Sequence, residues 1–96
     1  MSRNDQKGGP GGAARKATEA ADLLADAAHA IYGETEWLNR FARAIDLDPR
    51  TFRGFLSGRS EPDADTMKRA LRLLTERRDE ADRVARQMEG FIRKAP

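Results

Sequence analysis

The chain has 96 residues and no cysteine, so it can hold neither disulfide bonds nor thiolate metal sites, and its length suits one small domain. A cysteine-free chain fits a reducing cytoplasm, and no apolar run approaches the ~18 residues that a membrane-spanning helix needs. The net charge is only +2, yet residues 17–34 carry four acidic residues and no lysine or arginine, whereas residues 66–96 carry nine basic and five acidic residues. This asymmetry suits a protein with one surface that faces nucleic acid, although ordinary solvated charge explains it equally well.

The first third of the chain divides into a polar leader and a helix. Residues 1–12 are polar and glycine-rich, which predicts a flexible tail rather than a secretory signal; its basic residues either touch DNA or have no role. Residues 13–32 are rich in alanine and predict a helix that ends at Gly33. Its apolar stripe consists of Ala20, Leu24, Ala27, Ala28 and Ile31. His29, the only histidine, is expected at the surface or boundary rather than as a metal ligand.

Residues 35–45 predict a second helix. Its apolar face consists of Leu38, Phe41, Ala42 and Ile45. Glu34 or Thr35 stands where the N-terminal cap or first-turn acid belongs. Trp37 opens this helix and has two interpretations: an aromatic side chain at the edge of the core, or an indole that contacts the DNA backbone.

A tight turn leads into a third helix. Asp46 tolerates the left-handed backbone conformation that such a turn needs, and Leu47 is expected to lie beneath the turn. Asp48 is a strong N-cap residue and Pro49 suits the first helical position. A short helix is therefore predicted from Pro49 to about Ser57.

This third helix carries an aromatic and a basic face. Phe52 and Phe55 would anchor it to the core, while Arg50 and Arg53 point outward, where an arginine can donate two hydrogen bonds to guanine, worth about 1–3 kcal/mol of base discrimination. Gly54 would let the helix approach DNA closely, unless it serves helix packing instead. The candidate DNA-binding residues are Arg50, Thr51, Arg53, Gly54, Ser57 and Arg59, together with Arg43 and Trp37 from the second helix.

The last segment is helical and amphipathic. Residues 58–65 form a loop, after which Asp63 or Asp65 caps a helix that continues to about residue 94, either as one helix or as two bent near residues 75–79. Its apolar positions continue at heptad-like spacing, and Arg78 interrupts this row. The spacing favours self-association over packing of the helix on its own domain. The candidate dimerisation residues are Ala81, Val84, Ala85, Met88, Phe91 and Ile92. The expected organisation is a tail (1–12), a DNA-binding domain (13–78) and a helical extension (79–96).

Residues 31–78 resemble the lambda-repressor-like (Cro/Xre-type) helix-turn-helix regulators, and especially small members associated with phages and mobile elements. The resemblance is carried by Tyr32-Gly33-Glu34, Trp37-Leu38, Phe41-Ala42-Arg43-Ala44-Ile45, Leu47-Asp48, Thr51-Phe52, Ser57-Gly58-Arg59 and Pro62. It implies an all-α bundle of four or five helices, with the third helix in the DNA groove and Arg43 at the phosphates. Asp46 occupies a turn position that is usually glycine in this family.

The leading functional hypothesis is a sequence-specific regulator of transcription that binds double-stranded DNA as a cytoplasmic homodimer on an inverted repeat. The alternative is a helical protein-interaction module, antitoxin-like or an anti-activator, and RNA binding comes third because no aromatic platform is evident. No catalytic constellation or metal-ligand cluster appears, so the sequence predicts neither an enzyme nor a cofactor, a metal or a small-molecule ligand.

Overall fold

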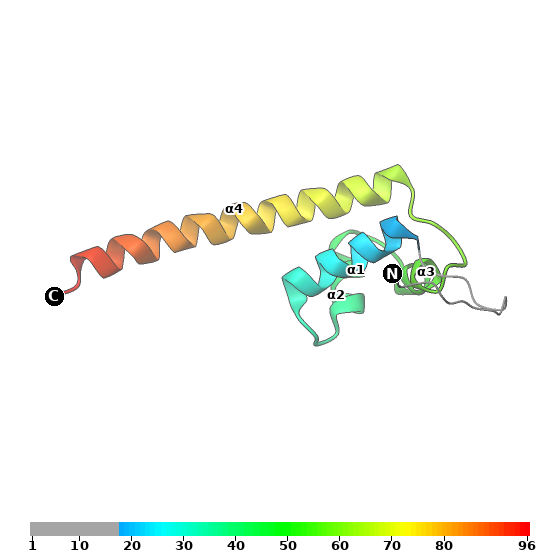
Figure 1. Ribbon diagram of the computed structural model, residues 1–96, viewed down its shortest axis with the longest axis horizontal. Helices are drawn as coiled ribbons and strands as arrows, with labels where there is room; N and C mark the ends of the chain where they lie inside the picture. Colours follow the sequence, from blue (N-terminus) through cyan, green and yellow to red (C-terminus); the bar gives the residue numbers. More distant parts are fainter. Residues whose placement is uncertain (1–17) are drawn as a thin grey trace, which may run out of the picture.

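A computed structural model describes residues 18–96, and every regular element in this range is a helix (Figure 1). The elements are α1 (Glu19–Tyr32), α2 (Trp37–Ala44), α3 (Pro49–Leu56) and α4 (Ala64–Lys94). The predicted all-α class is confirmed. The predicted tail lies outside the described residues, as does the start of the first predicted helix. No helix within residues 18–96 is long and apolar enough to cross a membrane.

The first helix, α1, begins at Glu19, inside the range of residues 13–32 that its alanine content predicts as helical. Thr18 has an extended backbone and its hydroxyl accepts a hydrogen bond from the amide of Ala21, so α1 starts at Glu19. A threonine cap satisfies an amide that has no partner inside the helix, which outweighs helix propensity at this point. Gly33, at φ +70°, ends α1 as predicted.

The predicted cap of the second helix is wrong. Glu36 precedes α2 in a left-handed conformation, at φ +51°, and makes no side-chain capping bond, so neither Glu34 nor Thr35 caps the helix. The ring of Trp37 lies 4.1 Å from that of His29 and meets Phe52 edge-on at 6.0 Å between centroids. These aromatic contacts with α1 and α3, rather than a polar cap, hold the start of α2 in place.

The core lies where α1, α2, α3 and the first turns of α4 meet. Its buried apolar residues are Ala21, Leu24, Ala27, Ala28, Phe41, Ala42, Ile45, Phe52, Phe55 and Ala70. The predicted stripe residues Ala20, Ile31 and Leu38 are half-buried at its edge. Small alanines on α1 bring the larger side chains of the other helices close, and the rings of Phe41 and Phe52 lie 5.8 Å apart at its centre.

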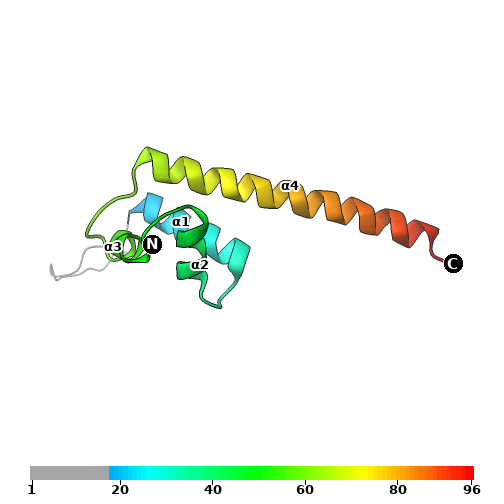
Figure 2. The same ribbon diagram turned by 180° about the vertical axis from the view of Figure 1, so that it is seen from behind.

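The fourth helix is continuous and extends well past the core. Asp63 caps it by accepting a hydrogen bond from the amide of Thr66, and its 31 residues, about 46 Å in length, contain no break. The prediction left open one helix or two, and the structure has one. Every residue from 76 to 89 is exposed, and both views show α4 projecting beyond α1–α3 (Figures 1 and 2). The radius of gyration is accordingly 17.6 Å, against about 12 Å for a compact chain of this length.

Candidate nucleic-acid interface

The turn between α2 and α3 is closed by backbone hydrogen bonds. The amide of Leu47 donates to the carbonyl of Ala42 at 2.7 Å, and that of Asp46 donates to the carbonyl of Arg43 at 3.1 Å. This bond pair is the Schellman motif, which needs a left-handed residue at its centre, and Asp46 has φ +59° as predicted. Leu47 is half-buried beneath the turn. The aspartate in the usual glycine position therefore keeps the turn tight.

The start of α3 follows the local chemistry of its sequence. The carboxylate of Asp48 accepts a hydrogen bond from the amide of Arg50 at 2.8 Å, and Pro49 occupies the first helical turn. The guanidinium of Arg50 also reaches back to the same carboxylate at 3.3 Å. The backbone amide of Arg50 and then its side chain hold the pKa of Asp48 below its ordinary value. Both predicted capping features are confirmed.

One face of α3 is fixed in the core. Phe52 is fully buried and Phe55 nearly so. The ring of Phe52 contacts both Phe41 and Trp37, so a single side chain ties α3 to the middle and the start of α2. Rotation of α3 about its axis would break these contacts, which fixes the direction of its opposite face.

The opposite face of α3 is exposed and basic. The side chain of Arg50 is 86% exposed, and Arg53, Thr51 and Ser57 are also exposed. Arg50, Arg53 and Ser57 lie within about one third of the helix circumference because they are three and four residues apart. These four residues, predicted as candidates, are brought together on one surface.

Gly54 lies on that side of α3 but is buried. The Arg59 guanidinium and the Ser60 hydroxyl cover it: a Cβ at Gly54 would lie 3.8 Å from Nη2 of Arg59 and 3.4 Å from Oγ of Ser60. A second Schellman motif, centred on Gly58 at φ +82°, folds the chain back so that the amide of Arg59 donates to the carbonyl of Gly54 at 2.9 Å. Arg59 therefore packs over Gly54 beside the exposed face, and Gly54 itself is not on the surface.

Arg69 of α4 is a contributor that sequence reasoning missed. Its Nη1 donates to the carbonyls of Ile45 at 2.7 Å and Asp46 at 3.1 Å, and its Nε lies 3.1 Å from the carboxylate of Asp65. Ile45 and Asp46 directly follow α2, so the charged donor on their carbonyls offsets the partial negative charge at the C-terminal end of that helix. Arg69 therefore holds the turn between α2 and α3 against α4, over a sequence separation that no local pattern reveals.

The two candidates from α2 differ in exposure. Arg43 is exposed in the last turn of α2, next to the turn that leads into α3. Trp37 is half-buried between His29 and Phe52, which is the core-edge position of the first interpretation. The six candidate dimerisation residues are all exposed on α4, away from this surface.

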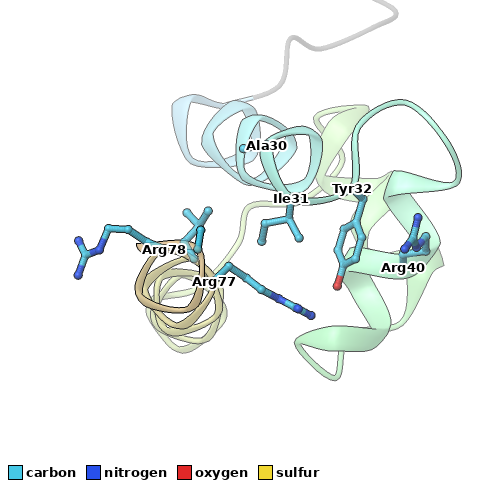
Figure 3. A pocket seen from close by; sticks show the side chains of 8 residues that line it. Ala30, Ile31, Tyr32, Arg40, Arg77 and Arg78 are labelled. Carbon is cyan, nitrogen blue, oxygen red and sulfur yellow. The ribbon is translucent and has the colours of Figure 1, made fainter. Parts of the chain in front are cut away.

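A separate pocket of about 510 Å³ lies between the end of α1, α2 and α4 (Figure 3). Arg40 stacks on the ring of Tyr32 at 4.6 Å, Arg77 reaches across the opening, and Arg78 points away from it. The three guanidinium groups point in different directions, so they do not converge on a single position where an anionic ligand could bind. Within residues 18–96 no group of three His, Cys, Asp or Glu side chains could hold a metal ion.

Comparison of the chain with protein-family models, with curated proteins and with solved structures finds no match in any of the three. The candidate interface therefore rests on its own geometry: a short helix anchored by two phenylalanines, a turn held by Arg69, and an exposed face that carries Arg50, Arg53 and Arg59.

Proposed function

We propose that this protein is a sequence-specific, double-stranded DNA-binding regulator of transcription of the lambda-repressor-like helix-turn-helix type. The observation that carries the proposal is the exposed arginine face of α3, whose orientation is fixed from behind by Phe52. Its eight residues form a helix narrow enough for the major groove of B-DNA, which is about 12 Å wide. Arg50 and Arg53 would reach base edges, and no enzymatic step is part of the proposal.

The residues around α3 would position it on the DNA backbone. Arg43 lies in the last turn of α2, Ser57 at the end of α3 and Arg59 in the loop that follows, where contacts to phosphates are usual. Thr51 lies in the first turn of α3 and would contact a base or the backbone. Gly54 is not among the residues proposed to contact DNA, because the loop after α3 covers it.

The active form in this proposal is a homodimer in the bacterial cytoplasm. Two copies would read the two halves of an inverted repeat, because a symmetric dimer presents two equivalent helices to successive turns of DNA about 34 Å apart. The exposed apolar side chains of α4 supply the surface for pairing. Binding at a promoter would either block the polymerase or recruit it.

Selection of binding sites from a pool of random duplex DNA tests the proposal. The expected result is an enriched inverted repeat in which each half carries at least one guanine that the wild-type protein requires and the Arg53→Ala variant does not. A pool that remains random after several rounds, with binding that depends only on salt, would contradict sequence-specific reading.

A protein-interaction module is the second candidate, favoured by the exposed apolar face of α4. Charge reversal at Arg50 and Arg53 would then leave the cellular function intact, whereas polar substitutions at Met88 and Ile92 would abolish it. In the DNA-binding proposal, the reversal of the two arginines abolishes function on its own.

A further inference from the structure

Two apolar surfaces have no partner among residues 18–96, and the first is a groove between α1 and α4. It has a volume of about 320 Å³ and is lined entirely by apolar side chains, including Ala27 and Ala70 at its floor. Leu23 and Leu71 form its rims and are 52% and 63% exposed. Large apolar side chains grouped in this way mark interaction sites.

The second surface is the C-terminal half of α4. Val84, Met88, Phe91 and Ile92 are 42–74% exposed on a stretch of helix that no other element within residues 18–96 covers. An isolated helix of about 15 residues has only marginal stability in water, so packing of its apolar face is the expected source of stability. A partner surface that covers these side chains would therefore stabilise this half of α4.

The two surfaces lie on one continuous seam of α4. The seam consists of two rows of residues that repeat every seven positions along α4. The first row is Met67, Leu74, Ala81 and Met88, and the second is Leu71, Arg78, Ala85 and Ile92. In the C-terminal half a third apolar row, Val84 and Phe91, widens the face. Two rows suffice for contact with one helix, whereas a three-row face fits a surface made by two helices. The α1–α4 groove is such a surface.

We propose that two copies of this chain pair through α4 in antiparallel orientation, each laying the C-terminal half of its α4 in the α1–α4 groove of the other. The inference rests on the homodimer of the proposed function, for which it supplies the geometry, and it does not require that the protein reads DNA. Such a reciprocal contact is closed, because each copy contributes one groove and one helix end.

Charge and shape select the antiparallel orientation. In a parallel pair in register, Arg78 on the seam would face its own counterpart, which is unfavourable at a helix interface, and both grooves would stay open. In the antiparallel pair, the row that contains Phe91 faces the side of the partner α4 on which α1 packs. Phe91 of one copy then lies over Ala70 of the other, beside Leu23.

The register follows from overlap of the whole helix, with the two-fold axis near Asp79 and Glu80 at the middle of α4. Apolar seam residues of the two copies then face each other: Leu71 of one copy lies opposite Met88 of the other, and Met67 lies opposite Ile92. Lys68 flanks Glu89, and Arg78 lies beside Asp82, so both flanking contacts join opposite charges. Small Ala81 and Ala85 near the axis let the two helices approach closely.

Cross-linking of a double cysteine variant, Lys68→Cys with Glu89→Cys, in the full chain tests this arrangement. The native chain has no cysteine, and both positions are exposed, so the fold tolerates the substitutions. The two residues are 21 positions apart on one helix, roughly 31 Å, which a short bifunctional maleimide cannot span within a copy. The variant is treated with this reagent without DNA, and the linked peptides are identified by mass spectrometry.

The expected result is a covalent dimer linked between positions 68 and 89, and a mass by light scattering of twice the chain mass before linkage. A matched control, Arg83→Cys with Glu89→Cys, places one cysteine on the face opposite the seam and should give no dimer linked through position 83. Links of 68 to 68 or 89 to 89, a mass of one chain, or a mass of more than two would each overturn the proposal. Because no DNA is present, these outcomes are independent of whether the protein binds a specific sequence.

Discussion

Phe52 is the residue on which the orientation of α3 depends. It is fully buried and contacts Phe41 and Trp37, so its removal leaves a cavity that two large rings surround. Phe52→Ala is expected to lower the free energy of unfolding by roughly 3–5 kcal/mol, measured by urea titration. Trp37 is the only tryptophan and its fluorescence reports the transition directly. Phe52→Leu should cost clearly less, and equal stability of the Phe52→Ala variant and the native chain would show that α3 is anchored elsewhere.

Substitution of Gly54 tests the stability of the fold and the affinity for DNA separately. A Cβ there meets only ordinary contacts, the nearest being Oγ of Ser60 at 3.4 Å, and alanine is the better helix former by about 1 kcal/mol. Gly54→Ala should therefore keep or slightly raise the midpoint of thermal unfolding. Its affinity for DNA should stay unchanged, because a Cβ that lies 3.8 Å from Nη2 of Arg59 lets that guanidinium keep its place over α3. Gly90→Ala in α4, where a Cβ meets nothing within 4 Å, is the matched control, and a loss of DNA affinity in Gly54→Ala alone would show that Gly54 itself lies against the DNA.

The sequence could predict the position of some side chains of the candidate interface but not of others. Arg50 and Arg53 were placed correctly on the exposed face of α3 because helical periodicity determines which side a residue occupies. The burial of Gly54 and the role of Arg69 were missed. Both depend on chain segments that fold back, the loop after Gly58 and the helix α4, and neither contact is expressed in the spacing of nearby residues.

At the scale of elements, the two aspartate caps make helix stability depend on pH. The amide and side chain of Arg50 lower the pKa of Asp48, and the hydroxyl and amide of Thr66 lower that of Asp63, both from an ordinary value of 3.8. A group with a lowered pKa in the folded state stabilises the fold above pH 3.8 and loses this contribution as the pH falls through the folded pKa. The midpoint of thermal unfolding should thus decrease below about pH 4.

The matched variants for this prediction are Asp48→Asn and Asp63→Asn, because asparagine also caps helices but does not titrate. Circular dichroism melts of the double variant should show a shallower decrease of the midpoint between about pH 4 and pH 2 than those of the native chain. The same slope in both proteins would assign the acid sensitivity to other carboxylates.

Helix boundaries were predicted well where local chemistry determines them. The turn at Asp46, the cap at Asp48 and the start at Pro49 follow from backbone and hydrogen-bonding preferences of those residues. The start of α2 was predicted incorrectly because Trp37 is fixed by rings from two other helices, and a left-handed Glu36 precedes it without a cap. Tertiary contacts override local signals at that point.

For the whole molecule, the main structural result is a small helical body with a long projecting helix. The predicted boundary between a domain (13–78) and an extension (79–96) falls inside α4, so the two parts share one continuous helix. The heptad-like spacing indicated a pairing surface. It could not show that the seam also passes along a groove of the body, because Leu23 and Leu71 come together only in the folded chain.

The most direct test of the central claim is a titration of the full chain onto its selected DNA and onto a scrambled duplex at two salt concentrations, with the native protein, Arg53→Ala and Arg43→Ala. We expect tight binding of two copies to the selected DNA, a loss of about 1–3 kcal/mol for Arg53→Ala on that DNA alone, and a similar loss on both duplexes for Arg43→Ala. Equal affinity of the native protein for both duplexes, vanishing with added salt, would contradict it and leave only general attraction between arginines and phosphates.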